Sequence, residues 1–407
     1  LITWILNKFA FRLGGYSYKF KGNKKRSITL VDTFFITKSI LEEGCVDKRY
    51  LKDIDKLLAK NNQEFTFLPV FYQGKNPLNY YKISKAFRAT PFSYLTEYQL
   101  LEWAEIFELI IFTAYYPFKV LKFAKDISPS SLLARLTKYE LINTLNIISV
   151  NAHIRYRVGL RLGQNFKNIK LISWCENQTI DKNLYKGIRA VGNGSKIYGC
   201  QFFQTFPGTV SCNFPDNEIR NGVTPDVVLV NGETYLPSNS PILHKVGISL
   251  RNQKLFESDL IVDDSKAGIL LLLPIATKDS DHIIHTAMTS FLKDTRLYIK
   301  LHPAQPLSKK LQLPPLWLQT SDDIYELFKR VNVVITTGSG AAVEAVATGI
   351  SVIVVENQDL FSTNPCCELG RGEIWDAVFS QDELYKKYCD LTNYRKQHPE
   401  EIKMLAY

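Results

Sequence analysis

Two stretches near the end of the chain decide the fold: Tyr298-Ile-Lys-Leu-His-Pro303 and Val333-Val-Ile-Thr-Thr-Gly-Ser-Gly-Ala-Ala-Val-Glu344. Each begins as a short apolar run, which is typical of a buried β-strand. The first run ends at a lysine and a histidine, and the second ends in a loop of small residues that opens into a predicted helix. We expect the two strands to lie side by side in a parallel sheet, where their ends would form a pocket for a phosphate group.

Apolar runs alternate with helical patterns along the rest of the chain, which predicts an α/β fold with parallel sheets. Turn-forming residues at 235–241 separate two sets of runs and predict a linker. We therefore predict two Rossmann-like domains facing across a cleft: an acceptor-side domain at 1–236 and a nucleotide-sugar-binding domain at 242–390, followed by a C-terminal helix at 391–407. Strands are expected at 27–31, 65–71, 169–174, 195–200, 226–230, 268–274, 298–302, 333–336 and 351–355, and helices at 48–60, 95–125, 130–163, 179–190, 281–292, 322–330 and 341–347.

The composition sets limits on the class of protein. The chain has 407 residues, 45% of them apolar, and a net charge of +10. This charge suits phosphorylated substrates, an anionic membrane surface or nucleic acid, and does not separate them. Seven cysteines show no metal-binding spacing, so we expect reduced thiols and a cytoplasmic protein. No apolar run reaches the length of a membrane span. Because the chain begins at Leu1, we expect a fragment or a trimmed domain.

The loop after the strand at 333–336 is the main candidate for donor binding. Backbone N–H groups at a helix start suit a pyrophosphate or a phosphodiester. The loop lacks the Lys-Ser/Thr ending of a P-loop, which argues against ATP hydrolysis. Glu344 is predicted either to accept hydrogen bonds from ribose hydroxyls or to interact with the helix dipole. The predicted donor-binding residues are Lys300, His302, Pro303, Thr336, Thr337, Gly338, Ser339, Gly340 and Glu344.

A carboxylate ends the strand at 169–174 in the first domain. Glu176 is predicted either to act as a general base or nucleophile, or to cap the following helix. Asp32 is the second catalytic candidate, because it also lies at a strand end. Asn177 and Gln178 are predicted to position sugar hydroxyls. There is no acidic pair of the kind that holds a metal in metal-dependent sugar transferases, so we predict neither a metal nor a cofactor.

The segment 95–125 is apolar almost all round, and lysines follow it. Two interpretations are open: a core helix, or a membrane-facing element. The first thirteen residues allow the same two interpretations.

The strand ending Lys300-Leu-His-Pro303 and the loop Thr336-Thr-Gly-Ser-Gly340 resemble the donor half of GT-B glycosyltransferases that make bacterial surface polysaccharides. The likeness is greatest to enzymes that use CMP-activated sugars, such as Kdo transferases and bacterial sialyltransferases. Other segments resemble surface-carbohydrate biosynthesis proteins, so the resemblance touches about residues 27 to 380; these segments are Leu30-Val-Asp-Thr-Phe-Phe35, Gly44-Cys-Val-Asp-Lys-Arg-Tyr50, Trp174-Cys-Glu-Asn-Gln178 and Asp226-Val-Val-Leu-Val-Asn-Gly232.

The resemblance implies a metal-independent transfer of Kdo or another nonulosonate from a CMP-sugar donor to a glycan or lipid-linked acceptor. It also implies peripheral contact with the inner membrane and no nucleic-acid partner. The acidic run that supplies the base in sialyltransferases is absent, which favours Kdo or another sugar over sialic acid. Three alternatives stay open: a CDP-glycerol-type glycerophosphotransferase, a UDP-sugar 2-epimerase, and a non-catalytic assembly subunit.

Overall fold

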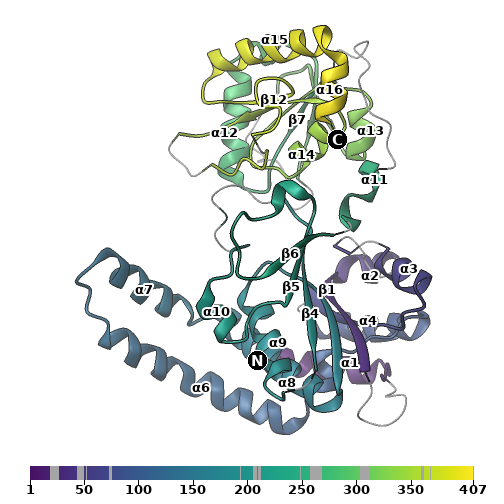
Figure 1. Cartoon of the computed structure of the whole chain (residues 1–407), viewed down its shortest axis with the longest axis vertical. Helices are drawn as coiled ribbons and strands as arrows, with labels where there is room; N and C mark the ends of the chain where they lie inside the picture. Colours follow the sequence, from purple (N-terminus) through teal and green to yellow (C-terminus); the bar gives the residue numbers. More distant parts are fainter. Residues whose placement is uncertain are drawn as a thin grey trace. The chain divides into compact units, whose positions relative to one another are not determined.

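The computed structural model of the chain divides into two units (Figure 1). Leu1–Phe202 and Ser211–Arg251 form the N-terminal unit, and Phe203–Val210 and Asn252–Tyr407 form the C-terminal unit. Pro303, one of the predicted donor-binding residues, lies outside the described residues. The structure describes residues 1–18, 27–43, 50, 51, 53–72, 76–192, 194–204, 209, 212–247, 249–256, 268–302, 312–358, 362–366 and 368–406.

The N-terminal unit is built on a six-stranded parallel sheet in the order β2-β1-β3-β4-β5-β6. From β1 the chain adds β2 on one side and then returns to add β3 on the other. The direction of winding therefore reverses between β1 and β3, where doubly wound sheets bind ligands beyond the carboxyl ends of the strands. The strands are β1 (Ser27–Ile36), β2 (Thr66–Tyr72), β3 (Asn168–Trp174), β4 (Lys196–Gln201), β5 (Val227–Val230) and β6 (Leu243–Val246).

The predicted helix at 130–163 is wrong as a single element, because the chain forms two helices there. Thr144 ends the first helix, and the side chain of Asn146 accepts a hydrogen bond from the Ile148 N–H at the start of the second. Asparagine is a favoured N-cap for this reason. The α-helices of this unit are α1 (Ile2–Leu13), α2 (Thr37–Glu43), α3 (Ile54–Lys60), α4 (Pro77–Ala89), α5 (Glu97–Leu100), α6 (Trp103–Asp126), α7 (Leu132–Asn143), α8 (Ile147–Asn165), α9 (Thr179–Arg189) and α10 (Asp216–Arg220).

The last strand of the first sheet follows the segment that was predicted to join the domains. β6 pairs with β5 in parallel, from Val227 opposite Leu243 to Val230 opposite Val246. Residues 235–241 are therefore a loop within the N-terminal unit, and the chain passes to the other unit after Arg251. The turn-forming residues of this loop connect β5 to β6. Loops within a domain and linkers between domains are rich in the same residue types, so the composition does not distinguish them.

The C-terminal unit has a second six-stranded parallel sheet, in the order β12-β11-β10-β7-β8-β9. The expected pairing of the strands at 298–302 and 333–336 is wrong, because β7 lies between β8 and β10. The winding of the C-terminal sheet reverses between β7 and β10. The elements are α11 (Gln253–Phe256), β7 (Ile269–Leu272), α12 (Thr277–Met288), β8 (Leu297–Lys300), β9 (Trp317–Thr320), α13 (Ile324–Phe328), β10 (Val333–Thr336), α14 (Ala341–Ala347), β11 (Ser351–Val355), β12 (Trp375–Val378), α15 (Gln381–Gln397) and α16 (Pro399–Leu405).

The strands of the C-terminal sheet are apolar on both faces. Ile269 and Leu271 of β7 belong to one hydrophobic cluster, whereas Leu270 and Leu272 belong to another. Successive side chains of a strand point to opposite faces, so the sheet is covered on both sides, as parallel sheets with helical crossovers require. The two sheets confirm the predicted α/β class with two Rossmann-like domains.

Candidate functional site

The strongest candidate site lies at the carboxyl ends of β10 and β11, next to the point between β7 and β10 where the C-terminal sheet reverses its winding. A small hollow of about 30 Å³ opens there. This is room for one or two waters or a single small polar group. The hollow is lined by Asp279 and His282 of α12, by Thr337 and Gly338 after β10, and by Val354, Val355, Glu356, Asn357, Ser362, Thr363 and Asn364.

Two adjacent threonines of the predicted donor loop have different surroundings. The Thr336 hydroxyl is fully buried and donates to the Leu272 carbonyl oxygen at 2.8 Å, which ties β10 to β7. The Thr337 side chain is 5% exposed, and its Oγ1 has no hydrogen-bond partner among the described residues. A buried polar atom without a partner costs about 1–3 kcal/mol. Of the two hydroxyl groups, that of Thr337 is therefore the one whose hydrogen-bonding capacity is unused among the described residues.

The glycines of this loop do not leave open space beside the backbone. A Cβ atom at Gly338 would lie 2.0 Å from Thr363 Oγ1, and one at Gly340 would lie 2.7 Å from Gln204 Oε1. Gly338 is thus required by the Thr363 side chain and backbone, whereas the flexible Gln204 side chain beside Gly340 could move aside. The expectation that these positions give a phosphate free access to the backbone has no support in this geometry. Ser339 is half-buried, and its N–H donates to the Thr337 carbonyl oxygen at 2.7 Å.

Carboxylates and an imidazole line the same hollow as Thr337. His282 Nε2 lies 3.3 Å from the Glu356 carbonyl oxygen, and the Asn364 amide donates to Glu356 Oε1 at 3.2 Å. With Asp279 also present, the lining has two acidic side chains, which would repel a phosphate and would accept hydrogen bonds from hydroxyl groups. The sequence analysis missed Asp279, His282 and Glu356. The signal available was their position after the strands that flank the reversal point.

The predicted cationic residues lie on the same edge of the sheet but two strands away. Lys300 is opposite Leu272, and the next strand beyond β7 is β10. Two strand spacings separate β8 from β10, about 10 Å. The Lys300 ammonium group donates to the Asp322 carbonyl oxygen at 2.5 Å and has two further hydrogens. His302 is half-buried just beyond the end of β8.

Glu344, in the first turn of α14, is held by an aromatic side chain. The Tyr325 hydroxyl donates to its Oε2 at 2.7 Å. This contact fixes the carboxylate and is compatible with either predicted role, the ribose contact or the dipole interaction.

The prediction that Asp32 ends a strand is wrong, because β1 continues to Ile36. Asp32 lies within β1, opposite Ser173 of β3, and the N-terminal sheet reverses its winding between these two strands. Asp32 is 2% exposed and accepts hydrogen bonds at 2.7 Å from the Arg155 guanidinium on both carboxylate oxygens. Ser173 Oγ also donates to it at 2.8 Å, and the Tyr185 hydroxyl donates to Ser173 Oγ at 3.0 Å. Asp32 is therefore neutralised and shielded, which is unsuitable for a general base that must reach an acceptor.

A second buried carboxylate, Asp181, was missed by the sequence analysis. Its Oδ2 accepts hydrogen bonds from the N–H groups of Glu176 and Gln178, both at 3.1 Å. Burial and, to a smaller extent, the neighbouring Asp32 carboxylate raise the pKa of Asp181 to about 7, against the opposing effect of the hydrogen bond from the Gln178 N–H. Asp181, and not Glu176, thus caps α9.

Glu176 remains half-buried at the end of β3 and has partners within its own loop. The Trp174 indole donates to Oε1 at 2.8 Å, and the Gln178 amide donates to Oε2 at 2.6 Å. Asn177 has a left-handed backbone, with φ 55°, and its amide lies 3.3 Å from both the Asn213 carbonyl oxygen and Glu218 Oε2. Of the predicted acceptor-side residues, Glu176 and the exposed Gln178 are accessible, whereas Asn177 is buried.

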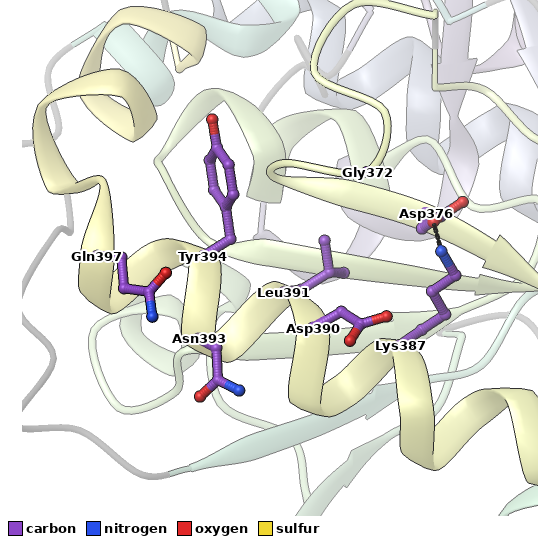
Figure 2. A pocket seen from close by; sticks show the side chains of 8 residues that line it. All are labelled: Gly372, Asp376, Lys387, Asp390, Leu391, Asn393, Tyr394 and Gln397. Atoms are coloured by element: carbon purple, nitrogen blue, oxygen red, sulfur yellow. Dashed lines mark ion pairs between the residues drawn. The ribbon is translucent and has the colours of Figure 1, made fainter.

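A larger hollow of about 330 Å³ lies elsewhere on the C-terminal unit, between α15 and the segment that leads into β12 (Figure 2). Two of its charged groups are paired, since Lys387 Nζ lies 2.5 Å from Asp376 Oδ2, and Arg371 Nε lies 3.6 Å from Asp376 Oδ1. Gly372 precedes β12, so this hollow is at the amino end of that strand. Doubly wound sheets bind ligands at the carboxyl ends, and we therefore assign it no role in donor binding.

Among the described residues, no cluster of three or more histidine, cysteine, aspartate or glutamate side chains could hold a metal ion. Within the same ranges, no helix has the length and apolarity that a membrane span needs.

No family model matches the sequence, and no curated protein matches it. Solved structures with a similar course of the chain include the glycotransferase of kitacinnamycin, with a TM-score of 0.48, 10% identity and 95% of each chain covered. The calicheamicin glycosyltransferase CalG4 has a TM-score of 0.46, 10% identity and 94% of each chain covered. A putative UDP-N-acetylglucosamine 2-epimerase from Listeria monocytogenes has a TM-score of 0.45 and 12% identity, covering 94% of this chain and 90% of that one. At this level of likeness the site must be argued from its own residues.

Proposed function

We propose that this chain is a glycosyltransferase that moves a sugar, Kdo or another nonulosonate, from a CMP-activated donor to a surface glycan or lipid-linked acceptor. The observation that carries the proposal is the buried, unpartnered Thr337 hydroxyl in a polar hollow next to the reversal point of the C-terminal sheet. Open α/β sheets bind nucleotides at this place. The choice of CMP and of the sugar rests on the sequence resemblance alone.

The charges along this edge suggest how the donor would lie. Hydroxyl groups of the ribose or of the sugar would enter the hollow, where Thr337 and Glu356 offer hydrogen bonds. The phosphate would lie toward Lys300 and His302, about two strand spacings away. The Lys300 ammonium group and an N–H group of the His302 imidazole would stabilise the charge on the departing CMP without a metal ion.

On the acceptor side, we propose Glu176 as the general base. It is half-buried at the reversal point of its sheet, whereas Asp32 is paired with Arg155 and Asp181 is buried as a helix cap. Gln178, which donates to the Glu176 carboxylate, would orient it. Asp32 then has a structural function in this account.

The proposal is tested by the thermal stability of the purified chain with CMP, CDP, UDP, GDP or ADP, without added metal. Selective stabilisation by CMP is expected, because a ligand that binds only the folded state raises its stability. CDP would favour glycerophosphate transfer, and UDP would favour the epimerase or a hexose transferase. No response to any nucleotide would favour the assembly subunit.

Thr337→Val removes the hydroxyl and keeps the volume of the side chain. It should weaken nucleotide binding by roughly fivefold to tenfold, the value of one hydrogen bond. Thr289→Val is the matched control, because Thr289 bonds only within α12 and lies outside the hollow. Equal affinities for the two variants would remove Thr337 from the site.

A further inference from the structure

The helical hairpin formed by α6 and α7, with the adjoining face of α1, exposes many large apolar side chains. Figure 1 shows the two helices running side by side away from the sheet of the N-terminal unit. α6 has 24 residues, which corresponds to about 36 Å. Contiguous apolar surface on a soluble monomer rarely exceeds a few hundred Å², and larger patches mark interaction sites.

The outward face of α6 is as apolar as the face that it buries. Leu109 and Val120 point into the unit and are at most 2% exposed. Phe107, Phe118 and Leu121, which are 65%, 72% and 53% exposed, lie on the opposite side of the helix. The core-helix interpretation therefore accounts for one face of α6 only, and the core does not explain the apolar side chains of the other face.

Neighbouring helices extend this surface. No residue of α7 is buried, and Leu133 is 75% exposed. The Phe9 ring of α1 lies 5.1 Å from that of Trp103 at the start of α6, and the Arg12 guanidinium lies over the same indole at 5.9 Å. The apolar side chains thus come from three helices rather than from a single seam, which differs from the narrow stripe that a coiled-coil partner would need.

Basic residues border the apolar side chains. The hairpin, residues 103–143, has five basic and four acidic residues. Two of the acidic residues, Glu105 and Glu108, are paired with arginines of α8, which leaves Asp126 and Glu140 against the five basic residues. Large apolar side chains with tyrosine, tryptophan and Lys/Arg are typical of helices that lie in the interface of an anionic bilayer. The basic residues are Lys119, Lys122, Lys125, Arg135 and Lys138.

We propose that the α6–α7 hairpin and the exposed face of α1 bind the surface of a bilayer that contains anionic lipids. The apolar side chains would enter the headgroup region, and the lysines would lie against lipid phosphates. This inference rests on the exposure and charge of these helices and does not depend on which nucleotide the other unit binds.

The test is co-sedimentation of the full chain with two kinds of vesicle, phosphatidylcholine alone and phosphatidylcholine mixed with phosphatidylglycerol. Binding to the mixed vesicles, weakened by salt, is expected. Phe118→Ser should lower this partitioning by roughly tenfold. Phe256→Ser is the matched control, because Phe256 is 73% exposed on α11 of the other unit and should leave partitioning unchanged.

Three results would overturn the proposal: no binding to the mixed vesicles, equal binding to both kinds of vesicle, or equal loss in the two variants. Sedimentation equilibrium without lipid measures the oligomeric state of the chain and of the Phe118→Ser variant. A dimer that Phe118→Ser converts to a monomer would show that a second copy of the chain covers this surface instead. Circular dichroism of each variant would establish that the helices are retained.

Discussion

The two sheets of this protein reverse their winding in the same way, but the side chains near the two reversal points have different hydrogen-bonding environments. In the N-terminal sheet, the carboxylate of Asp32 is buried and closed off by Arg155 and Ser173. In the C-terminal sheet, Thr337 is equally buried but keeps an unused hydroxyl beside a hollow. The hydrogen bonds to the Asp32 carboxylate stabilise the fold, although Arg155 Nε is also buried without a partner among the described residues; Thr337 differs in that it lines a hollow. Side chains near the reversal points of two related topologies thus need not have equivalent functions.

The largest expected effect tests whether the N-terminal network is structural. Arg155→Met leaves the Asp32 carboxylate buried without its partner, which should cost about 3–5 kcal/mol of unfolding free energy. Urea denaturation of the variant and of the natural chain measures this loss of unfolding free energy. As a control, Arg330→Met removes a half-exposed pair with Asp322 and should cost less than about 1 kcal/mol. Similar losses in both variants would contradict a structural role for the hydrogen bonds to Asp32.

A second prediction concerns the cationic end of the C-terminal edge. His302→Ala should lower kcat by roughly 100-fold if the imidazole stabilises the departing nucleotide. His398→Ala, between α15 and α16, is the control and should leave turnover unchanged. Full turnover and full donor affinity in the His302 variant would place the phosphate elsewhere.

The third prediction uses the titration of Asp181. Its pKa is about 7 in the folded chain and 3.8 at its ordinary value, so the folded state holds a proton that the unfolded state releases between these values. Stability contributed by this group is therefore present at low pH and falls by about 1.4 kcal/mol per pH unit as pH rises toward 7. Asp181→Asn cannot titrate and should flatten this part of the pH profile. Identical slopes for the variant and the natural chain would count against the buried carboxylate.

The smallest expected effect concerns Glu344. Tyr325→Phe removes the hydroxyl that holds this carboxylate and should weaken donor binding by roughly threefold to tenfold if Glu344 contacts the ribose. Tyr385→Phe, on exposed surface of α15, should have no effect. Unchanged donor affinity in the Tyr325 variant would favour the helix-dipole role.

The sequence predicted the strands whose apolar runs are continuous, such as 333–336 and 351–355, because burial on both faces leaves a clear pattern. It did not predict β9 or β12, whose four residues mix polar and apolar side chains. It also paired β8 with β10, since the order of strands in a sheet depends on long-range contacts that spacing does not encode.

From the sequence, the candidate site could be located only at the ends of predicted strands, and the contacts of its side chains could not be predicted. The loop at 336–340 and Glu176 were found because they follow apolar runs. The pairing of Asp32 with Arg155 joins residues 123 positions apart, and no local pattern marks it. The difference between Thr336 and Thr337 depends on which side of one backbone each hydroxyl faces, so only the structure separates them.

The most direct test of the contrast between the two sheets is a crystal structure of the chain with CMP bound. We predict a ribose hydroxyl within about 3 Å of Thr337 Oγ1, with the phosphate directed toward Lys300 and His302. Density for the nucleotide beside Asp32, in the hollow under α15, or with its phosphate against Asp279 and Glu356 would contradict the account.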